Sequence, residues 1–295
     1  MPSTTKHYGI IVGVDGSPAS DAAVSWAAHD AVMRGVPLTL MHVQDPIART
    51  WSPAKVLEEV AGWQKAEGRG ILASASKIAH DIANDSSQTT INGELQFSAP
   101  RPTLVDRSED AELIVVGTDG RGALARGLLG SVSSGLVRHA RCPVAVIHDA
   151  EPRMPDPSEA PVLVGVDGSS ASELATEIAF AEASRRRVDL IALHAWSDRE
   201  TIELPGVDWP AVKADEERLM SEALAGWQER YPDVTVSKLL VCDRPARALV
   251  ETSQSAQLVV VGSHGRNALT RTFFGSVSNA VVQSVRVPVI VARPS

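Results

Sequence analysis

The chain reads Gly117-Thr-Asp-Gly120, then nine residues, then Gly130-Ser131, and it repeats this glycine pattern once more. The second copy is Gly262-Ser-His-Gly265, nine residues and Gly275-Ser276, at an offset of 145, and ten of the seventeen positions in residues 117–133 match their partners. Each copy follows four apolar residues typical of a buried strand and precedes a helix-like run. Such a turn is typical of phosphate binding, because glycine permits close approach and the free N–H groups at a helix start face the anion.

The duplication extends beyond this glycine loop to the whole chain. Val12-Gly-Val-Asp-Gly-Ser17 recurs as Val164-Gly-Val-Asp-Gly-Ser169 at an offset of 152, and His42 pairs with His194 at the same offset. Because the offset later falls from 152 to 145, the second copy is seven residues shorter between these motifs. Two copies of this length predict two ordinary domains. Their expected bounds are residues 1–149 and 161–295, with a stiff, solvated, proline-containing linker at residues 150–160.

Composition and charge exclude several classes of protein. With 44% hydrophobic and 22% charged residues, the chain is expected to be globular. A net charge of -8 argues against general nucleic-acid binding, which needs basic surface. No apolar run approaches the roughly 18 residues of a membrane span, and no signal peptide is evident. Cys142 and Cys242 occupy non-equivalent positions without a CxxC partner, which predicts free thiols and a cytoplasmic protein.

Apolar periodicity predicts alternating strands and helices in both halves. Strands are expected at residues 8–14, 36–43, 90–97, 113–116 and 144–148, and again at 162–166, 189–194, 234–241, 258–261 and 287–292. In the first half, helices are expected after a cap at Ser17 or Ser20, within residues 55–83, and at residues 103–110 and 132–139. This alternation predicts an α/β fold, with a parallel sheet covered by helices on both faces.

The geometry of such a sheet predicts where a ligand binds. In open parallel sheets, ligands bind beyond the carboxyl ends of the strands, at the point where the strand order reverses. Asp15 follows the first strand and Gly117 follows the fourth. If those two strands are neighbours, the acidic turn and the glycine loop face one crevice.

Together, the Val-Asp-Gly-Ser turn and the Gly-x2-Gly-x9-Gly-Ser loop resemble the universal stress protein family, in its ATP-binding branch. The resemblance covers essentially the whole chain as a tandem pair, and its alternating hydrophobic and charged patches are similar to those of two-domain mycobacterial members, which regulate growth and persistence under stress. It implies a doubly wound five-stranded parallel sheet in each half, with strand order 3-2-1-4-5, in the adenine nucleotide alpha-hydrolase-like class. It also implies ATP as the ligand, with Mg²⁺ or Mn²⁺ bound through the phosphates.

The resemblance also implies roles for particular residues of both halves. An aspartate with its two preceding residues approaches the adenosine part of the ligand, the end of the second strand meets adenine, and the glycine loop with the start of its helix holds the phosphates. The candidate residues are Gly13, Val14, Asp15, Val43, Gly117, Gly120, Arg121, Gly130, Ser131, Val132 and Ser133 in the first half, and Gly165, Val166, Asp167, Ala195, Gly262, Gly265, Arg266, Gly275, Ser276, Val277 and Ser278 in the second. Independently of the family, Ser131 and Ser276 are expected at helix N-caps, where a hydroxyl can donate to phosphate.

The two loops differ at two positions, which predicts unequal nucleotide affinities. Asp119 in the first loop corresponds to His264 in the second, and Gly122 corresponds to Asn267. A carboxylate repels phosphates unless a divalent metal intervenes, whereas histidine attracts them when protonated or donates a hydrogen bond when neutral. Two arginines recur in both loops, either as solvated charges or as phosphate contacts: Arg121 with Arg266, and Arg126 with Arg271.

Other chemistries lack their motifs. The chain has no Gly-x4-Gly-Lys-Ser/Thr loop, dinucleotide fingerprint, Gly-x-Ser-x-Gly elbow or metal-binding histidine spacing, so neither a catalytic residue nor a protein-held metal is predicted. His42 and His194 are interpreted as packing residues. Three function classes stay open: a nucleotide-binding regulator with slow or no hydrolysis, an ATP-consuming hydrolase or adenylating transferase, and a protein whose glycine loops bind nothing. The first is favoured, because no general base and no second substrate pocket are evident.

Partners are predicted only in outline. The fifth strand of each half, residues 144–148 and 289–292, is an expected sheet edge, and exposed edges invite strand pairing. Pairing between the two halves gives an internal pseudo-dimer, and two chains are expected to form a homodimer. A regulatory protein partner is expected but has no signature in the sequence.

Overall fold

The computed structural model describes residues 8–46, 54–83, 89–118, 120, 129–148, 159–195, 209–265 and 274–293. The chain divides into two compact units, Met1–Asp149 and Ala150–Pro294, which are called the first and the second unit below. No helix of the described residues is long and apolar enough to cross a membrane.

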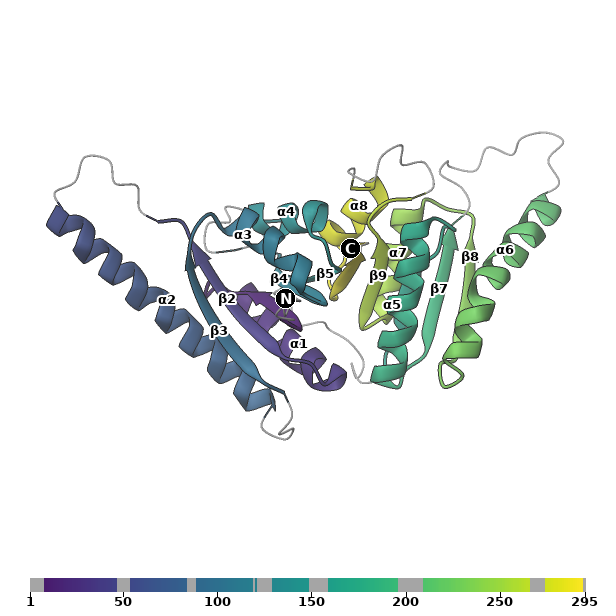
Figure 1. Cartoon of the computed structure of the whole chain (residues 1–295). Coiled ribbons are helices and arrows are strands. Elements are labelled where there is room, and N and C mark those ends of the chain that lie inside the picture. The colour runs from purple at the N-terminus through teal and green to yellow at the C-terminus, as the bar shows by residue number, and fades with distance from the viewer. Residues whose placement is uncertain are drawn as a thin grey trace, which may run out of the picture. The chain divides into compact units, whose positions relative to one another are not determined.

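The first unit is a parallel sheet of five strands in the order β3-β2-β1-β4-β5, as predicted (Figure 1). Its elements are β1 (Ile10–Gly13), α1 (Pro18–Arg34), β2 (Leu38–Gln44), α2 (Ala54–Ala83), β3 (Ile91–Phe97), α3 (Pro100–Arg107), the short 3-10 helix η1 (Ser108–Asp110), β4 (Leu113–Gly117), α4 (Ser131–His139) and β5 (Val144–Ile147). The register pairs Ile10 with Leu38 on one side and with Leu113 on the other.

The second unit repeats this architecture, in the order β8-β7-β6-β9-β10. Its elements are β6 (Val162–Gly165), α5 (Ser170–Arg186), β7 (Leu190–Ala195), α6 (Trp209–Arg230), β8 (Val236–Val241), α7 (Pro245–Thr252), η2 (Ser253–Ser255), β9 (Leu258–Gly262), α8 (Ser276–Ser284) and β10 (Val289–Ala292). The duplication read from the sequence is therefore a duplication of the fold.

The central strands are buried on both faces, which explains their near-continuous apolar sequences. Ile10, Ile11 and Val12 of β1 have no exposed surface, and the strand next to them, β4, is buried from Leu113 to Val116. Right-handed crossovers place α1 and α2 on one face of the sheet and α3 and α4 on the other, because the strand order reverses after β3.

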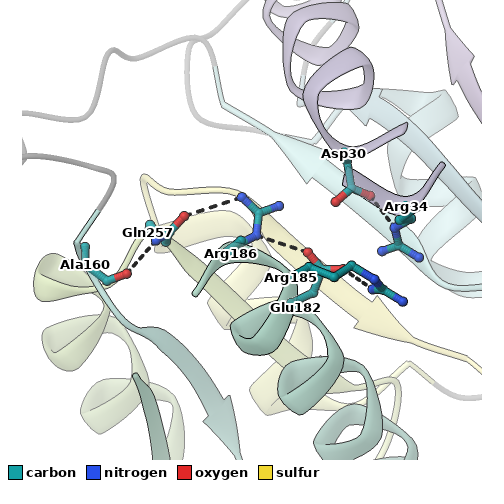
Figure 2. Close-up of polar contacts among 7 residues, drawn as sticks. All are labelled: Asp30, Arg34, Ala160, Glu182, Arg185, Arg186 and Gln257. Atoms are coloured by element: carbon teal, nitrogen blue, oxygen red, sulfur yellow. Dashed lines mark hydrogen bonds and ion pairs between the residues drawn. The ribbon is translucent and has the colours of Figure 1, made fainter. Parts of the chain in front are cut away.

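Buried carboxylates at the ends of α1 and α5 are held by arginines on the same helix (Figure 2). Asp30 is fully buried and accepts a hydrogen bond from Arg34 Nε at 2.7 Å. At the equivalent position of α5, Glu182 accepts from Arg185 at 2.9 Å and from Arg186 at 3.1 Å. Pairing within the helix offsets the cost of removing each carboxylate from water.

One helix begins earlier than the sequence predicted. The helix expected at residues 103–110 starts at Pro100, after the extended residue Ala99, and its last turn is the 3-10 helix Ser108–Asp110. Proline is favoured in the first turn of a helix, because its fixed φ is already helical and its missing N–H needs no partner.

Candidate functional site

The strand order reverses between β1 and β4, and the predicted acidic turn and glycine loop meet at that point. Asp15 follows β1, and a Cβ placed on Gly120, just after β4, would lie 2.5 Å from Asp15 Oδ2. In the second unit, a Cβ on Gly265 would lie 2.7 Å from Asp167 Oδ2. A side chain at this glycine would therefore displace the carboxylate, and each unit has this contact at the carboxyl ends of its central strands.

Each of these aspartates is oriented by its own turn. Asp15 Oδ1 accepts hydrogen bonds from the Ser17 backbone N at 3.0 Å and from Ser17 Oγ at 2.6 Å. Asp167 Oδ1 accepts from the Ser169 N at 2.9 Å. The intervening glycine, Gly16, has φ of 76°, in the left-handed region that favours glycine. One carboxylate oxygen is thus fixed by the turn, while the other faces the loop.

The first unit concentrates negative charge at this turn. Burial raises the pKa of Asp21, in the first turn of α1, and the neighbouring charge of Asp15 raises it further. Both effects disfavour the ionised carboxylate. A ligand that brings positive charge to this turn would reduce the repulsion between Asp15 and Asp21.

Gly117 and Gly262, predicted as phosphate-cradling residues, are in close contact with a neighbouring helix. A Cβ on Gly117 would lie 2.8 Å from the carbonyl carbon, carbonyl oxygen and Cβ of Ala19 in α1. A Cβ on Gly262 would lie 2.8 Å from the carbonyl carbon of Ala171 in α5. The absence of a side chain here lets the helix pack against the strand end. Sequence analysis missed this role, because it depends on a contact about a hundred residues away.

The helix after each glycine loop begins at the predicted serine and not one residue later, which corrects the expected N-cap. Gly130 and Gly275 are the N-caps, and Ser131 and Ser276 are the first helical residues. The first hydrogen bond within α4 runs from Ser134 N to Gly130 O, and in α8 it runs from Asn279 N to Gly275 O. Among the described residues, no backbone hydrogen bond uses the N–H groups of residues 131–133 or 276–278.

N–H groups at the positive end of a helix dipole are favourable positions for an anion. Ser131 and Ser276 are exposed, and within the described part of the chain their hydroxyls make no hydrogen bond. By contrast, Ser133 Oγ donates to Gly117 O at 2.7 Å, and Ser278 Oγ donates to Gly262 O at 2.6 Å. Their hydroxyl protons tie the helix to the strand end, so what they can offer an anion is their backbone N–H groups.

The end of the second strand, predicted to meet adenine, extends past the end of the first strand in both units. β2 continues to Gln44, past its last pairing with β1 at Gly13 and Met41, so Val43 lies beyond the end of β1. Ala195 ends β7 in the same way, beyond the last pairing of Gly165 with Leu193. Val43, Val14 and Val166 are buried.

Two histidines that sequence analysis interpreted as packing residues make polar contacts with the backbone just after β1 and β6. His42 Nδ1 lies 2.6 Å from the carbonyl oxygen of Val14, and His194 Nδ1 lies 2.6 Å from that of Val166. Both rings are buried, with 5% and 6% of their surface exposed. Their recurrence at the same offset as the aspartates was the available signal, but the sequence does not show which carbonyl each ring faces.

Several predicted residues lie outside the described part of the chain. They are Asp119, Arg121, Gly122, Arg126, Arg266, Asn267 and Arg271. Within the described residues, no group of three or more His, Cys, Asp or Glu side chains is placed to hold a metal ion.

The fold and the site together define a tandem pair of doubly wound α/β domains, each with an acidic turn and a glycine loop at its strand-order reversal. The model of the universal stress protein family matches residues 9–148 and 160–293, and the chain belongs to that family. It is 59% identical over 295 residues to a universal stress protein of Mycobacterium tuberculosis, covering 100% of both chains. It is 53% identical to another from the same organism, covering 100% of this chain and 99% of the relative.

The fold also matches a solved structure. A universal stress protein from Archaeoglobus fulgidus superimposes with a TM-score of 0.72, at 18% identity, over 98% of this chain and 100% of that one. The predicted family, its tandem organisation and the likeness to mycobacterial two-domain members are confirmed.

Proposed function

We propose that each unit binds one adenine nucleotide, ATP, and that the protein is a nucleotide-dependent regulator of growth or survival under stress. The observation that carries this proposal is the contact of Asp15 with Gly120, repeated by Asp167 with Gly265, next to the free N–H groups of a helix N-terminus. A carboxylate suits ribose hydroxyls, which donate hydrogen bonds, and helix N–H groups suit phosphates.

The proposed ligand position follows from these chemical preferences. The ribose lies against Asp15 or Asp167, and the phosphates lie over the loop and the N–H groups of residues 131–133 or 276–278. The backbone beyond β1 at Val43, or beyond β6 at Ala195, meets adenine. Mg²⁺ or Mn²⁺ would be bound through the phosphates and would offset negative charge near Asp15 and Asp21.

Slow or absent hydrolysis is part of the proposal. Asp15 and Asp167 are the carboxylates at the two crevices within the described residues, and each accepts a backbone N–H from its own turn. Because both carboxylates are engaged in orienting these turns, we assign them to ligand positioning and not to proton abstraction from water.

The test is to purify the full chain without added nucleotide and to identify bound small molecules by mass spectrometry, then to measure turnover. Bound ATP with negligible phosphate release supports a regulator. Rapid ATP consumption supports the alternative, an ATP-using enzyme. If the protein binds no nucleotide, even at millimolar ATP, the proposal is wrong.

A regulator must pass its nucleotide state to a partner. We propose a homodimer and a regulatory protein partner whose association depends on bound ATP. Light scattering of the purified chain, with and without ATP, tests the first of these. A molar mass of one chain under both conditions excludes the homodimer.

A further inference from the structure

We propose that His42 and His194 are positioning residues of the two nucleotide sites, and that the second site, unlike the first, is coupled to a proton held between His194 and Glu216. The proposal rests on the proposed function, since it names a regulation of the same sites. Its structural basis is the 2.6 Å contact from each ring to the carbonyl that precedes Asp15 or Asp167.

The contact fixes the donor on one ring nitrogen. A carbonyl oxygen can only accept, so Nδ1 carries a proton in both rings. Since Val14 precedes Asp15, and Val166 precedes Asp167, each ring holds the peptide that aims the aspartate at its glycine loop. His42 and His194 therefore act on the ligand through the β1 and β6 turns and do not touch it.

The other ring nitrogen distinguishes the two units. His42 Nε2 lies 3.3 Å from Gln44 Oε1, and the Gln44 amide is held by its donation to Gln64 O at 3.0 Å. An amide oxygen also only accepts, but as a neutral group it stabilises a second proton on the ring far less than a carboxylate does. His42 can therefore hold the Val14 carbonyl as a neutral imidazole with its proton on Nδ1.

In the second unit the partner is a carboxylate. His194 Nε2 lies 3.0 Å from Glu216 Oε2, and the Glu216 side chain is only 22% exposed. An ionised carboxylate has no proton to donate, so this hydrogen bond needs a second proton on the ring. With Val166 O on one side and Glu216 on the other, His194 is expected to be an imidazolium that bridges β6 and α6.

Among the described charged side chains, Glu216 is the one that contacts the His194 ring. Leu240 of β8 pairs with His194 in the sheet register. Other charged groups of the helices of this unit pair with one another: Glu182 of α5 with Arg185 and Arg186, Arg247 of α7 with Asp243 and Glu251, and Lys213 of α6 with Glu217.

Loss of one ring proton from His194 removes a hydrogen bond that supports the second site. A neutral His194 can donate to Val166 or to Glu216 but not to both, so a lone pair then faces one of the two acceptors. Either outcome weakens the support of the Asp167 turn by about one hydrogen bond. Nucleotide affinity at the second site is therefore expected to fall as His194 deprotonates, while the first site stays nearly constant.

The charge state is tested first and without nucleotide, by long-range ¹⁵N–¹H NMR of the labelled full chain. His42→Gln and His194→Gln variants assign the ring signals. At about pH 7, His194 is expected to show protons on both nitrogens and His42 on Nδ1 alone. A neutral His194 ring at that pH overturns the proposal, whether or not the protein binds ATP.

The linkage is tested in chains with one working site. Ser131→Asp places a carboxylate at the first phosphate position and leaves the second site, and Ser276→Asp does the reverse. Between about pH 6 and 8, affinity for a fluorescent ATP analogue is expected to fall about fivefold further in the Ser131→Asp chain than in the Ser276→Asp chain. The ionisation of the nucleotide affects both chains equally, but His264 is present only in the second site, so the part of the difference assigned to His194 is the part that Glu216→Gln removes.

Exchanging the partners provides the matched controls. Glu216→Gln should abolish the extra pH dependence of the second site, and Gln44→Glu should introduce one into the first. If Glu216→Gln keeps the original pH profile while its circular dichroism is unchanged, the proposed linkage is wrong. If neither single-site chain binds nucleotide at any pH, the proposed function fails, and the NMR result still decides the charge of His194.

Discussion

Gly117 has no room for a side chain, because the backbone of Ala19 occupies the space where a Cβ would lie. We therefore expect Gly117→Ala to lower the free energy of unfolding by about 1–3 kcal/mol, the usual cost of overpacking. Urea unfolding followed by circular dichroism measures this loss. A loss of nucleotide binding in this variant would not by itself indicate a lost phosphate contact.

The matched control for this substitution is another glycine of the same unit. Gly62 lies in α2, and nothing lies within 4 Å of a Cβ placed there. Gly62→Ala is expected to raise the free energy of unfolding by about 0.5–1 kcal/mol through helix propensity. Equal effects of the two substitutions would contradict the close packing of α1 against β4.

Asp21 gives a pH dependence of known sign. Its pKa is raised in the folded state by burial and by Asp15, so the folded protein favours the protonated carboxyl. The resulting destabilisation is absent below the ordinary aspartate pKa of 3.8 and is complete once the pH exceeds the raised pKa of the folded state. Asp21→Asn should remove it.

Urea unfolding at several pH values tests this sign. The stability of Asp21→Asn relative to the unmodified protein is expected to increase from about pH 3 to pH 7, because only the unmodified protein acquires the unfavourable charge. A relative stability that stays constant or decreases over this range would show that Asp21 is not destabilised by its surroundings.

At the scale of elements, the contact between α3 and α4 and the equivalent contact between α7 and α8 use different residues. A Cβ on Gly135 of α4 would lie 2.3 Å from Arg101 Cδ, so the arginine stem of α3 lies directly over this glycine. At the offset of 145, Ala246 and Ala280 replace Arg101 and Gly135. The second unit therefore has a small side chain at each of these two positions.

Converting the first pair to the second should reveal this coupling. Gly135→Ala alone is expected to raise the free energy of unfolding by less than Gly62→Ala does, because moving the exposed Arg101 stem causes a loss that offsets part of the helix-propensity gain. Adding Arg101→Ala should restore part of the loss. A double-mutant cycle in urea measures the interaction, and simple additivity of the two changes would contradict it.

The strands followed from local sequence, because β1 and β4 are apolar along their length, whereas their order was implied by the family resemblance and is confirmed by the structure. The start of α3 and the N-caps of α4 and α8 were misplaced by a few residues, since proline and glycine there satisfy the backbone without a recognisable capping side chain. The first residue of a helix is therefore set by the residues at its end, which the periodicity of apolar residues does not reveal.

The candidate site was predictable where a sequence motif marks its residues. Asp15 and Asp167 were found through their motif, and the structure places both against their glycine loops. The contact of Gly117 with Ala19 and that of His42 with Val14 were not predictable, because each joins segments that become neighbours only in the folded sheet.

For the whole molecule, duplication places two homologous sites in one chain, and their loops differ in charge. Asp119 and Arg121 of the first loop lie outside the described residues, and their charges are known from the sequence of the motif. His264 of the second loop is described: its Nδ1 lies 3.0 Å from Ser263 Oγ, and its carbonyl accepts from Ser169 Oγ at 3.4 Å. These contacts place it between the N-terminal turn of α5 and the loop that precedes α8.

We expect the first site to depend more strongly on divalent cations than the second. A carboxylate at Asp119 beside a triphosphate costs about 1 kcal/mol at close range in water, or about a fivefold loss of affinity, unless Mg²⁺ lies between them. His264 carries no such repulsion. Chelating Mg²⁺ should therefore weaken ATP binding to the Ser276→Asp chain, which keeps the first site, about fivefold more than to the Ser131→Asp chain.

Exchanging the loop residues isolates the cause of this difference. Asp119→His in the Ser276→Asp chain should reduce its Mg²⁺ dependence to that of the second site, and His264→Asp in the Ser131→Asp chain should increase it, as measured by titration calorimetry with and without chelator. If both exchanges leave the dependence unchanged, the two sites do not differ through this position. Duplication would then have conserved the phosphate chemistry of the loops, and any inequality of the sites must come from the turns beneath them.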